Sequence, residues 1–182
     1  MRRPQISTTL VAAATTFALL AGAAPAGAAD VVGRSFRAPV PTGWTTASTD
    51  RSGVRTFSLA SKGRLSAANV PARGRLGLAT LEAPLRGKGR RLSVSALADA
   101  IIGVPTGATD VRRVGRGGTK VAGAKAVSVR LTFRFRGRRI YQHDLVTRRG
   151  NRVIFIEAIS DVSRRSAAVR ELHTYVGGWR WR

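Results

Sequence analysis

Arginine clusters are the feature of this sequence with the clearest chemical meaning, because they can bind anions. The 182 residues include 28 Arg and 4 Lys against 9 Asp and Glu, a formal net charge of +23. The planar guanidinium offers a fixed fork of donors that fits carboxylate and phosphate groups. Two clusters lie at expected turns and supply the candidate anion-binding residues: Arg134, Arg136, Arg138, Arg139, Arg148, Arg149 and Arg152.

The positive charge also has a simpler explanation, which is a solvated surface that gives solubility and nonspecific attraction for polyanions. Codon usage in a GC-rich genome would explain the choice of Arg over Lys, but not the excess of positive over negative residues. Other basic residues stand at 86–91 and at Arg112-Arg113. Because the two candidate clusters close opposite ends of one expected strand, we expect separate patches.

Catalytic and metal chemistry is poorly supported by the sequence. His143 and His173 are the two histidines, and there is no cysteine. Thiolate sites, disulfides and Cys nucleophiles are therefore excluded, and a histidine metal site would have at most two imidazoles. There is no G-x-S-x-G elbow and no H-E-x-x-H pair. We expect a protein that is not an enzyme, with no catalytic residue, metal or cofactor.

Two weaker candidates have structural explanations that we favour. Arg130, Asp144 and Glu157 could form a pocket with one protonated acid, since neighbouring carboxylates push a pKa upward. Cross-strand ion pairing is the preferred interpretation. The glycine-rich residues 115–120 lack the G-x-x-x-x-G-K-[ST] spacing of a phosphate loop and are predicted to form a turn between strands.

The elements that must position these residues indicate an α+β fold. Short strands are expected within Phe36–Trp44, at Val54–Leu59 and at Leu76–Ala83. Ser93 can cap a helix that stops at Gly103. Residues 125–160 predict a three-stranded antiparallel meander that turns at Gly137 and at Gly150-Asn151. Ser160 or Asp161 can cap a last helix, with apolar residues at 168, 169, 172, 175 and 176, that stops at Gly177-Gly178.

The register of the meander follows from the expected loops. A loop over 136–138 sets Phe133 opposite Tyr141, Leu131 opposite His143 and Val129 opposite Leu145, and places Arg130 opposite Asp144. A two-residue loop at Gly150-Asn151 then places Asp144 opposite Glu157. Both faces of this sheet carry apolar residues, so helices should cover both sides. We expect Trp179 in the core, while Trp181 could serve the core or a lipid interface.

The amino-terminal residues predict export. Arg2 and Arg3 precede a largely apolar stretch, and Ala26-Gly27-Ala28 places small residues at the positions of a peptidase site. We expect a signal peptide at 1–28 with cleavage after Ala28, or alternatively after Ala29. An uncleaved membrane anchor is the other interpretation. Cleavage after Ala28 leaves a charge of +21, and no later run reaches the roughly 20 apolar residues of a membrane span.

Taken in order, these features resemble the PsbP-like superfamily. The sharpest piece is Phe-x-x-Pro-x-Pro-x-Gly-Trp at Phe36–Trp44, and the resemblance extends over about residues 34–182. It implies an antiparallel β-sheet sandwiched by helices, an α/β/α sandwich, and mostly non-enzymatic accessory or adaptor roles. It brings no shared catalytic set to this chain. The lipobox cysteine of related lipoproteins is missing, and the basicity is unusual.

The combined expectation is a secreted, single-domain protein over residues 30–182, located outside the cell and associated with its envelope. It would be a strongly basic binding or accessory protein for an anionic polymer, an anionic lipid surface or another envelope protein, without specific nucleic-acid recognition. The alternative is a structural adaptor that docks another exported protein, with incidental charge. A small hydrolase using Asp144 or Glu157 is the least favoured candidate.

Overall fold

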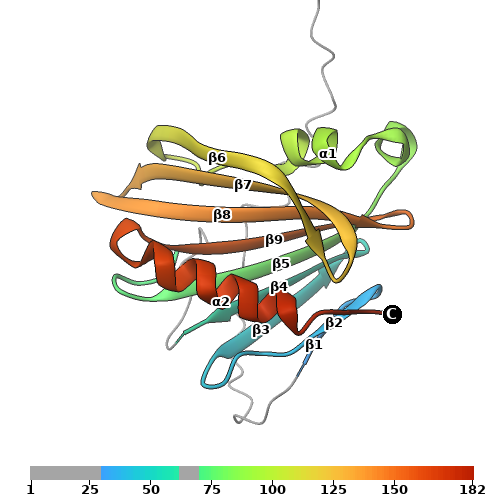
Figure 1. The fold of residues 1–182 in the computed structure, drawn as a ribbon, viewed down its shortest axis with the longest axis horizontal. Coiled ribbons are helices and arrows are strands. Elements are labelled where there is room, and N and C mark those ends of the chain that lie inside the picture. The colour runs from blue at the N-terminus through green and yellow to red at the C-terminus, as the bar shows by residue number, and fades with distance from the viewer. Residues whose placement is uncertain (1–29, 62–69) are drawn as a thin grey trace, which may run out of the picture.

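The computed structural model describes residues 30–61 and 70–182. The expected signal peptide 1–28, with both cleavage positions, lies outside the described residues. A seven-stranded antiparallel sheet has the order β3-β4-β5-β9-β8-β7-β6 (Figure 1). Its strands are β3 (Thr45–Arg51), β4 (Val54–Ala60), β5 (Leu76–Pro84), β6 (Thr109–Val121), β7 (Ala124–Phe135), β8 (Arg138–Arg149) and β9 (Arg152–Asp161).

Two α-helices cover opposite faces of this sheet, α1 (Val94–Ile101) and α2 (Arg165–Gly177). Leu97 and Ala98 of α1 pack with Val146, whereas Leu172 of α2 packs with Leu145. Because neighbouring strand residues point to opposite faces, the two helices lie on different sides. The sandwich of an antiparallel sheet between helices is therefore confirmed. Two 3-10 turns, η3 (Gly87–Arg91) and η4 (Val162–Arg164), precede α1 and α2.

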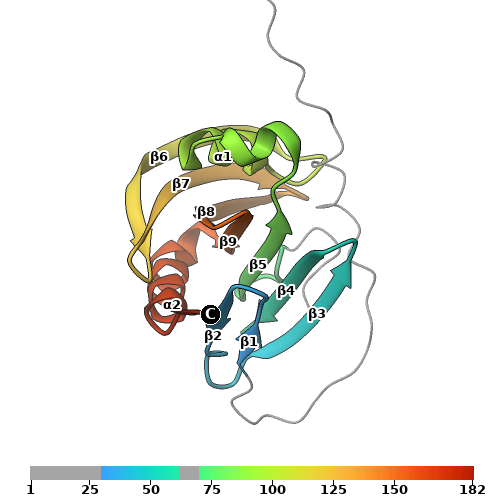
Figure 2. The same ribbon diagram turned by 90° about the vertical axis from the view of Figure 1, so that its right-hand side faces the viewer.

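A small second sheet joins the two ends of the described chain. It has the order β1-β2-β10, with β1 (Val31–Val32), β2 (Phe36–Ala38) and β10 (Arg180–Trp181). Figure 2 shows it beside α2, on the side toward which the large sheet curls. Trp179 is fully buried and stacks on Phe36, with ring centroids 4.1 Å apart. The predicted core role of Trp179 is thus confirmed.

Trp181 also belongs to the protein's own packing. Its ring lies 6.0 Å from that of Trp179, and its indole N–H donates to the carbonyl of Ala122 at 2.9 Å. The Trp181 ring is half-buried against the core cluster that contains Trp179, and its N–H has a hydrogen-bond acceptor. Of the two roles open for Trp181, the structure therefore favours the core.

The register of the β7–β8 hairpin corrects the sequence prediction by one residue. Phe133 pairs with Ile140, and Arg130 pairs with His143 rather than with Asp144. The loop has two residues, Arg136 and Gly137, both at positive φ, as a type I′ turn requires. The three-residue loop that we expected would have shifted every partner. In the β8–β9 hairpin, by contrast, the predicted pairing of Asp144 with Glu157 is confirmed.

The two helix starts also differ in outcome. Ser93 caps α1 as predicted, since its hydroxyl accepts from the Ala96 amide at 3.1 Å. Neither Ser160 nor Asp161 caps α2, which begins at Arg165 after η4. The Asp161 carboxylate instead accepts from the Gly74 amide at 2.7 Å and from Arg138. A long-range ion pair has replaced the expected local cap.

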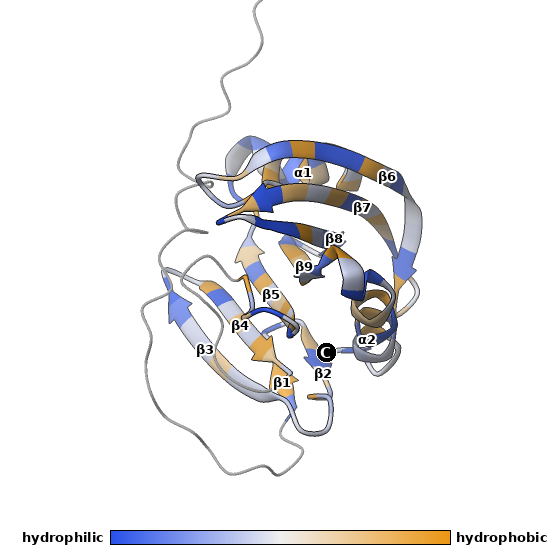
Figure 3. Ribbon diagram, turned by 90° about the vertical axis from the view of Figure 1, so that its left-hand side faces the viewer, coloured by the Kyte–Doolittle hydropathy of each residue, from blue (hydrophilic) through white to orange (hydrophobic). Residues whose placement is uncertain are grey.

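The edge strands β3 and β6 are the exposed parts of the sheet. Nearly every residue of β6 is exposed, and the strand is bulged near Arg112 and Gly115. Figure 3 shows hydrophilic colour over much of β3 and β6. Residues 115–120 lie inside β6, so the predicted turn there is wrong; the turn is at Ala122-Gly123. Positive charge and bulges on an edge strand discourage pairing with another chain.

Candidate anion-binding surface

The seven predicted arginines fall at opposite ends of β8, as expected for separate patches. Twelve residues separate the two hairpin ends of this strand, which at about 3.3 Å per residue is on the order of 40 Å. The three members beside the β8–β9 turn are Arg148, Arg149 and Arg152. The other four surround the β7–β8 turn. The structure therefore does not bring all seven into one site.

The cluster beside the β8–β9 turn is occupied by contacts within the protein. Arg152 is 15% exposed and donates to Glu82 at 2.8 Å and to the Gly53 carbonyl at 3.0 Å. Arg148 donates to the carbonyls of Gly150 and Leu92. The Arg149 guanidinium lies over the Trp181 ring at 5.6 Å. Of these three side chains, Arg149 alone stays exposed, so this cluster is mainly structural.

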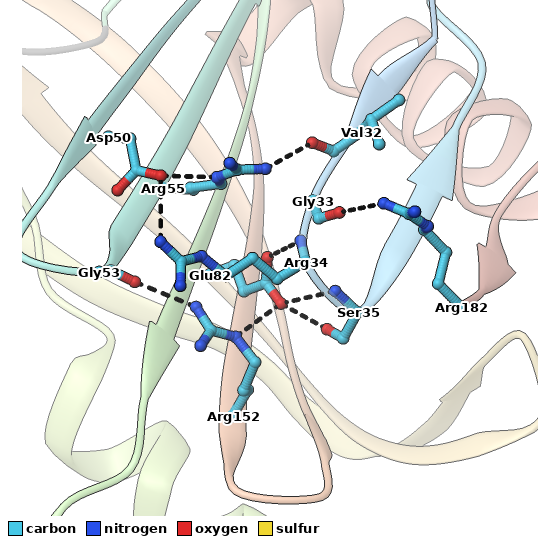
Figure 4. A network of polar contacts seen from close by, with 10 residues as sticks. All are labelled: Val32, Gly33, Arg34, Ser35, Asp50, Gly53, Arg55, Glu82, Arg152 and Arg182. Carbon is cyan, nitrogen blue, oxygen red and sulfur yellow. Dashed lines mark hydrogen bonds and ion pairs between the residues drawn. The ribbon is translucent and has the colours of Figure 1, made fainter.

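Glu82 is the centre of a polar network that ties the small sheet to the large one (Figure 4). Its side chain is fully buried on β5. Besides Arg152, it accepts from the amides of Arg34 and Ser35, at 2.6 and 2.9 Å, and from the Ser35 hydroxyl at 2.5 Å. Four donors and one opposite charge satisfy both carboxylate oxygens, which a buried charge requires.

Asp50 supports the same junction from the surface. It pairs with Arg55 at 2.7 Å and with Arg34 at 3.4 Å, and it keeps a partly exposed side chain. Hydrogen bonding from Arg55 lowers the pKa of Asp50 below its ordinary value. Exposed pairs of this kind contribute little to stability. The buried carboxylate of Glu82, rather than Asp50, therefore dominates this junction.

Arg138, at the other end of β8, is also structural. It donates twice to Asp161, at 2.7 and 2.9 Å, and once to the Pro71 carbonyl at 2.8 Å. Its side chain is 18% exposed and that of Asp161 is 13% exposed. Such a two-donor contact with a carboxylate uses the fork of the guanidinium fully. Arg138 is therefore not available to a partner.

Arg134 and Arg139 form the accessible part of the predicted site. They lie directly opposite each other in the β7–β8 pair, and both are exposed. Like charges directly opposite in a ladder destabilise a sheet. Arg112 of β6 pairs with Thr132, so it lies on the same face beside them. We call Arg112, Arg134 and Arg139 the arginine patch.

One acid partly compensates the arginine patch. Asp110 pairs with Arg134 at 3.0 Å, and both side chains are more than half exposed. Among the described residues, neither Arg112 nor Arg139 forms an ion pair. Arg136 stands at the adjacent turn, with its guanidinium 5.3 Å from the Phe135 ring centroid. The patch therefore keeps a net positive charge and accessible donors.

The predicted trio of Arg130, Asp144 and Glu157 is separated by the corrected register. Asp144 and Glu157 lie on the α1 face, while Arg130 and His143 lie on the α2 face. The expected cross-strand ion pairing of Arg130 with Asp144 is therefore wrong. Gln142, fully buried, donates to Asp144 at 2.8 Å and to the Gly103 carbonyl at 2.9 Å.

Asp144 is fully buried and Glu157 is half-buried, and within the described part of the chain neither forms an ion pair. Burial, and then the neighbouring charge of Glu157, raise the pKa of Asp144 well above its ordinary value. Burial raises the pKa of Glu157 to about 7. Neither residue lines the cavities of 490 and 260 Å³ at the two faces of β6. A raised pKa suits a general acid, but neither of these two cavities offers substrate a place beside the carboxyls.

The described residues, 30–61 and 70–182, hold no group of three or more His, Asp or Glu side chains arranged to bind a metal. Within the same residues, no helix has the length and apolar character needed to cross a membrane. Neither finding decides what the protein binds.

Comparisons with known proteins bear on the fold. No protein-family model matches the chain, and no curated protein matches it in sequence. Among solved structures it is similar to LpqN, involved in cell envelope biogenesis of Mycobacterium tuberculosis, with 12% identity, a TM-score of 0.55 and coverage of 80% of this chain and 82% of LpqN. It is also similar to cyanobacterial PsbP (CyanoP) from Synechocystis sp. PCC 6803, with 11% identity, a TM-score of 0.54 and coverage of 91% and 98%. At these identities the likeness concerns the fold.

Proposed function

We propose that this chain, which has a PsbP-like fold, is an exported accessory protein of the cell envelope. We propose further that it is not an enzyme and that it binds an anionic partner. A structural neighbour described as acting in cell envelope biogenesis supports the envelope context. The leader-like residues 1–28 support export. Fold likeness alone is weak evidence for function, so the partner must be argued from the surface.

The observation that carries the proposal is the arginine patch. Arg134 and Arg139 face each other across two strands, at a separation where like charges repel. The same repulsion exists between Arg149 and Arg152, but there Arg152 is paired with Glu82. Among the described residues Arg139 has no acidic partner, so the repulsion at the patch favours a role outside the fold. An anionic polymer or an anionic lipid surface would relieve it. The net charge of the chain adds long-range attraction for the same partners.

A comparison of two double variants tests this proposal. Arg134→Gln/Arg139→Gln and Arg148→Gln/Arg149→Gln lose the same charge at opposite ends of β8. We expect the first variant of the mature chain to elute from dextran sulfate at lower salt than the second, because polyanion binding releases counterions at each contact. Equal elution of the two variants would show that net charge alone governs retention and would overturn the patch.

A structural adaptor is the second candidate, and the exposed side chains of Val111 and Val114 on edge strand β6 favour it. An adaptor would bind its partner through apolar contacts, so the complex would survive high salt. The anionic-partner proposal requires the opposite. Binding to vesicles of phosphatidylglycerol that persists unchanged at 1 M NaCl (about a 3 Å screening length) would therefore contradict it.

A further inference from the structure

A small cavity lies on the α2 face of the sheet, where β6, β7 and β8 meet α2. Its volume is 260 Å³, which is below the range of about 300 to 1,000 Å³ that is typical of drug-sized ligands. Its polar side chains include those of Arg130, Ser128, His143 and His173, and Leu145 and Val176 add apolar wall. No Asp or Glu is among its lining residues. The cavity is therefore small and cationic.

Arg130 is held at this cavity over bare backbone of β6. Gly115 pairs with Arg130, and a Cβ built on Gly115 would come within 2.5 to 2.8 Å of the guanidinium. At Gly117 and Gly118, which line the cavity, an added Cβ would meet nothing within 4 Å. The glycines thus make room for the arginine at one position and leave open space at the next. Among the described residues, Arg130 pairs with no acid.

His143 is one of the residues that line the cavity, and its side chain has an unsatisfied polar atom. The residue is 6% exposed, and its Nε2 lies 2.8 Å from the Ser128 hydroxyl. Its Nδ1 is buried with no hydrogen-bond partner. An unpaired buried polar atom costs about 1 to 3 kcal/mol, so such atoms are rare without a reason. A ligand atom that pairs with Nδ1 would remove this penalty.

The protonation state of His143 fixes what it can offer. Burial, followed by the charges of Arg130 and His173, lowers its pKa to about 4. The ring is therefore neutral at pH 7, with one donor and one acceptor nitrogen. If the Ser128 hydroxyl donates to Nε2, then Nδ1 carries the proton and donates. A ligand oxygen would accept that hydrogen bond beside the guanidinium of Arg130.

We propose that this cavity binds the phosphate group of a small organic phosphate or of a lipid headgroup, with Arg130 supplying the charge and His143 a hydrogen bond. The absence of acids from the lining favours an anion, and a forked guanidinium without a partner matches phosphate geometry. Leu145 and Val176 would contact the carbon part of the ligand. This inference goes beyond the arginine patch, because it concerns a single phosphate group in the cavity rather than a polymer on the surface.

Titration of the folded mature chain with sn-glycerol 3-phosphate tests the site, with imidazole nitrogen NMR as the readout. We expect a saturable shift of the His143 Nδ1 resonance, and at least tenfold weaker binding in Arg130→Gln. His143→Asn should weaken binding as well. Arg134→Gln/Arg139→Gln is the matched control, because it removes charge from the same face outside the cavity. We expect this control to keep glycerol phosphate binding while it loses retention on dextran sulfate.

Vesicles of phosphatidylglycerol in phosphatidylcholine distinguish the two sources of the phosphate. Binding of the free ester that depends on Arg130 would identify a soluble ligand. Vesicle binding that depends on Arg130, without binding of the free ester, would identify a lipid headgroup. The proposal is overturned if Arg130→Gln and His143→Asn alter neither binding of the free ester nor binding of the vesicles, or if they alter binding no more than the control variant does. The arginine patch is tested separately by retention on dextran sulfate, so it can stand or fail without the cavity.

Discussion

Replacement of Arg152 should destabilise the protein and leave its anion binding intact. The side chain is 15% exposed and pairs with the fully buried carboxylate of Glu82 at 2.8 Å. Arg152→Gln would leave Glu82 with its three other donors but no opposite charge. Removal of one partner from a buried pair costs about 3 to 5 kcal/mol. Because the other donors remain, we expect the lower end of this range, about 3 kcal/mol.

Arg149→Gln is the matched control, since Arg149 pairs directly with Arg152 in the same hairpin. It would lose a contact with the Trp181 ring at 5.6 Å, worth about 0.5 to 1 kcal/mol at an exposed site. It would also relieve repulsion between two opposite arginines. We therefore expect a net change below about 1 kcal/mol. Urea unfolding followed by circular dichroism at pH 7 measures both variants, with the denaturant slope as a check for two-state behaviour.

A double-mutant cycle with Glu82→Gln isolates the pair itself. The two single losses should exceed the loss of the double variant by about 2 kcal/mol or more, because each single change leaves a buried group without its partner. The structural role of Arg152 would be refuted if Arg152→Gln lowered the free energy of unfolding by less than about 1 kcal/mol and also eluted from dextran sulfate at lower salt than Arg149→Gln.

Three further changes test other parts of the fold. An unfolded Glu157 ionises near pH 4.5, whereas the folded one keeps its proton to about pH 7, so the parent should lose up to about 3 kcal/mol of unfolding free energy between pH 5 and pH 8. Glu157→Gln should not show this loss. Urea unfolding of parent and variant at both pH values measures the two losses, and the opposite contribution of His143 cancels because it is present in both proteins. An equal change between pH 5 and pH 8 in parent and variant would contradict the raised pKa of Glu157. Ser93→Ala should cost about 1 kcal/mol through loss of the bond to the Ala96 amide, measured as a lower urea midpoint. Gly115→Ala should change the free energy of unfolding by less than about 1 kcal/mol, because the flexible Arg130 side chain can move away from the new methyl group. It should weaken glycerol phosphate binding by displacing the Arg130 guanidinium. An unaltered affinity would exclude the placement of Arg130 at the phosphate.

The regular parts of the fold could be predicted because their causes are local. Alternation along residues 125–135 fixed a strand, and Ser93 followed by apolar residues at helical spacing fixed α1. The wrong hairpin register had a local cause too. Arg136 takes a positive φ that is uncommon for arginine, so a two-residue turn was not the expected choice. One residue in that loop moved Arg130 to the face opposite Asp144.

The candidate sites could not be separated from the sequence, because the deciding partners are distant. Arg152 is bound by Glu82, 70 residues away, and Arg138 by Asp161, 23 residues away. Nothing local distinguishes these two arginines from Arg139, which has no such partner in residues 30–61 and 70–182. The sequence pattern associates Arg130 only with the acids Asp144 and Glu157. What marks it as part of a cavity is Gly115 on the neighbouring strand, and β6 had not been predicted.

The positive charge of this protein therefore has two different consequences. Where an arginine meets a buried carboxylate, as at Glu82 and Asp161, its charge is neutralised inside the fold and stabilises it. With only 9 acidic residues, most arginines cannot be matched in this way. Part of the remaining charge lies on one face. Arg134, which Asp110 compensates in part, faces Arg139 on the α2 side, and Arg130 stands on that same face beside an unpaired histidine nitrogen. A binding role requires unpaired charge at a particular place, whereas solubility depends on the total charge. The location of the unmatched charge, rather than its amount, is thus the argument for function.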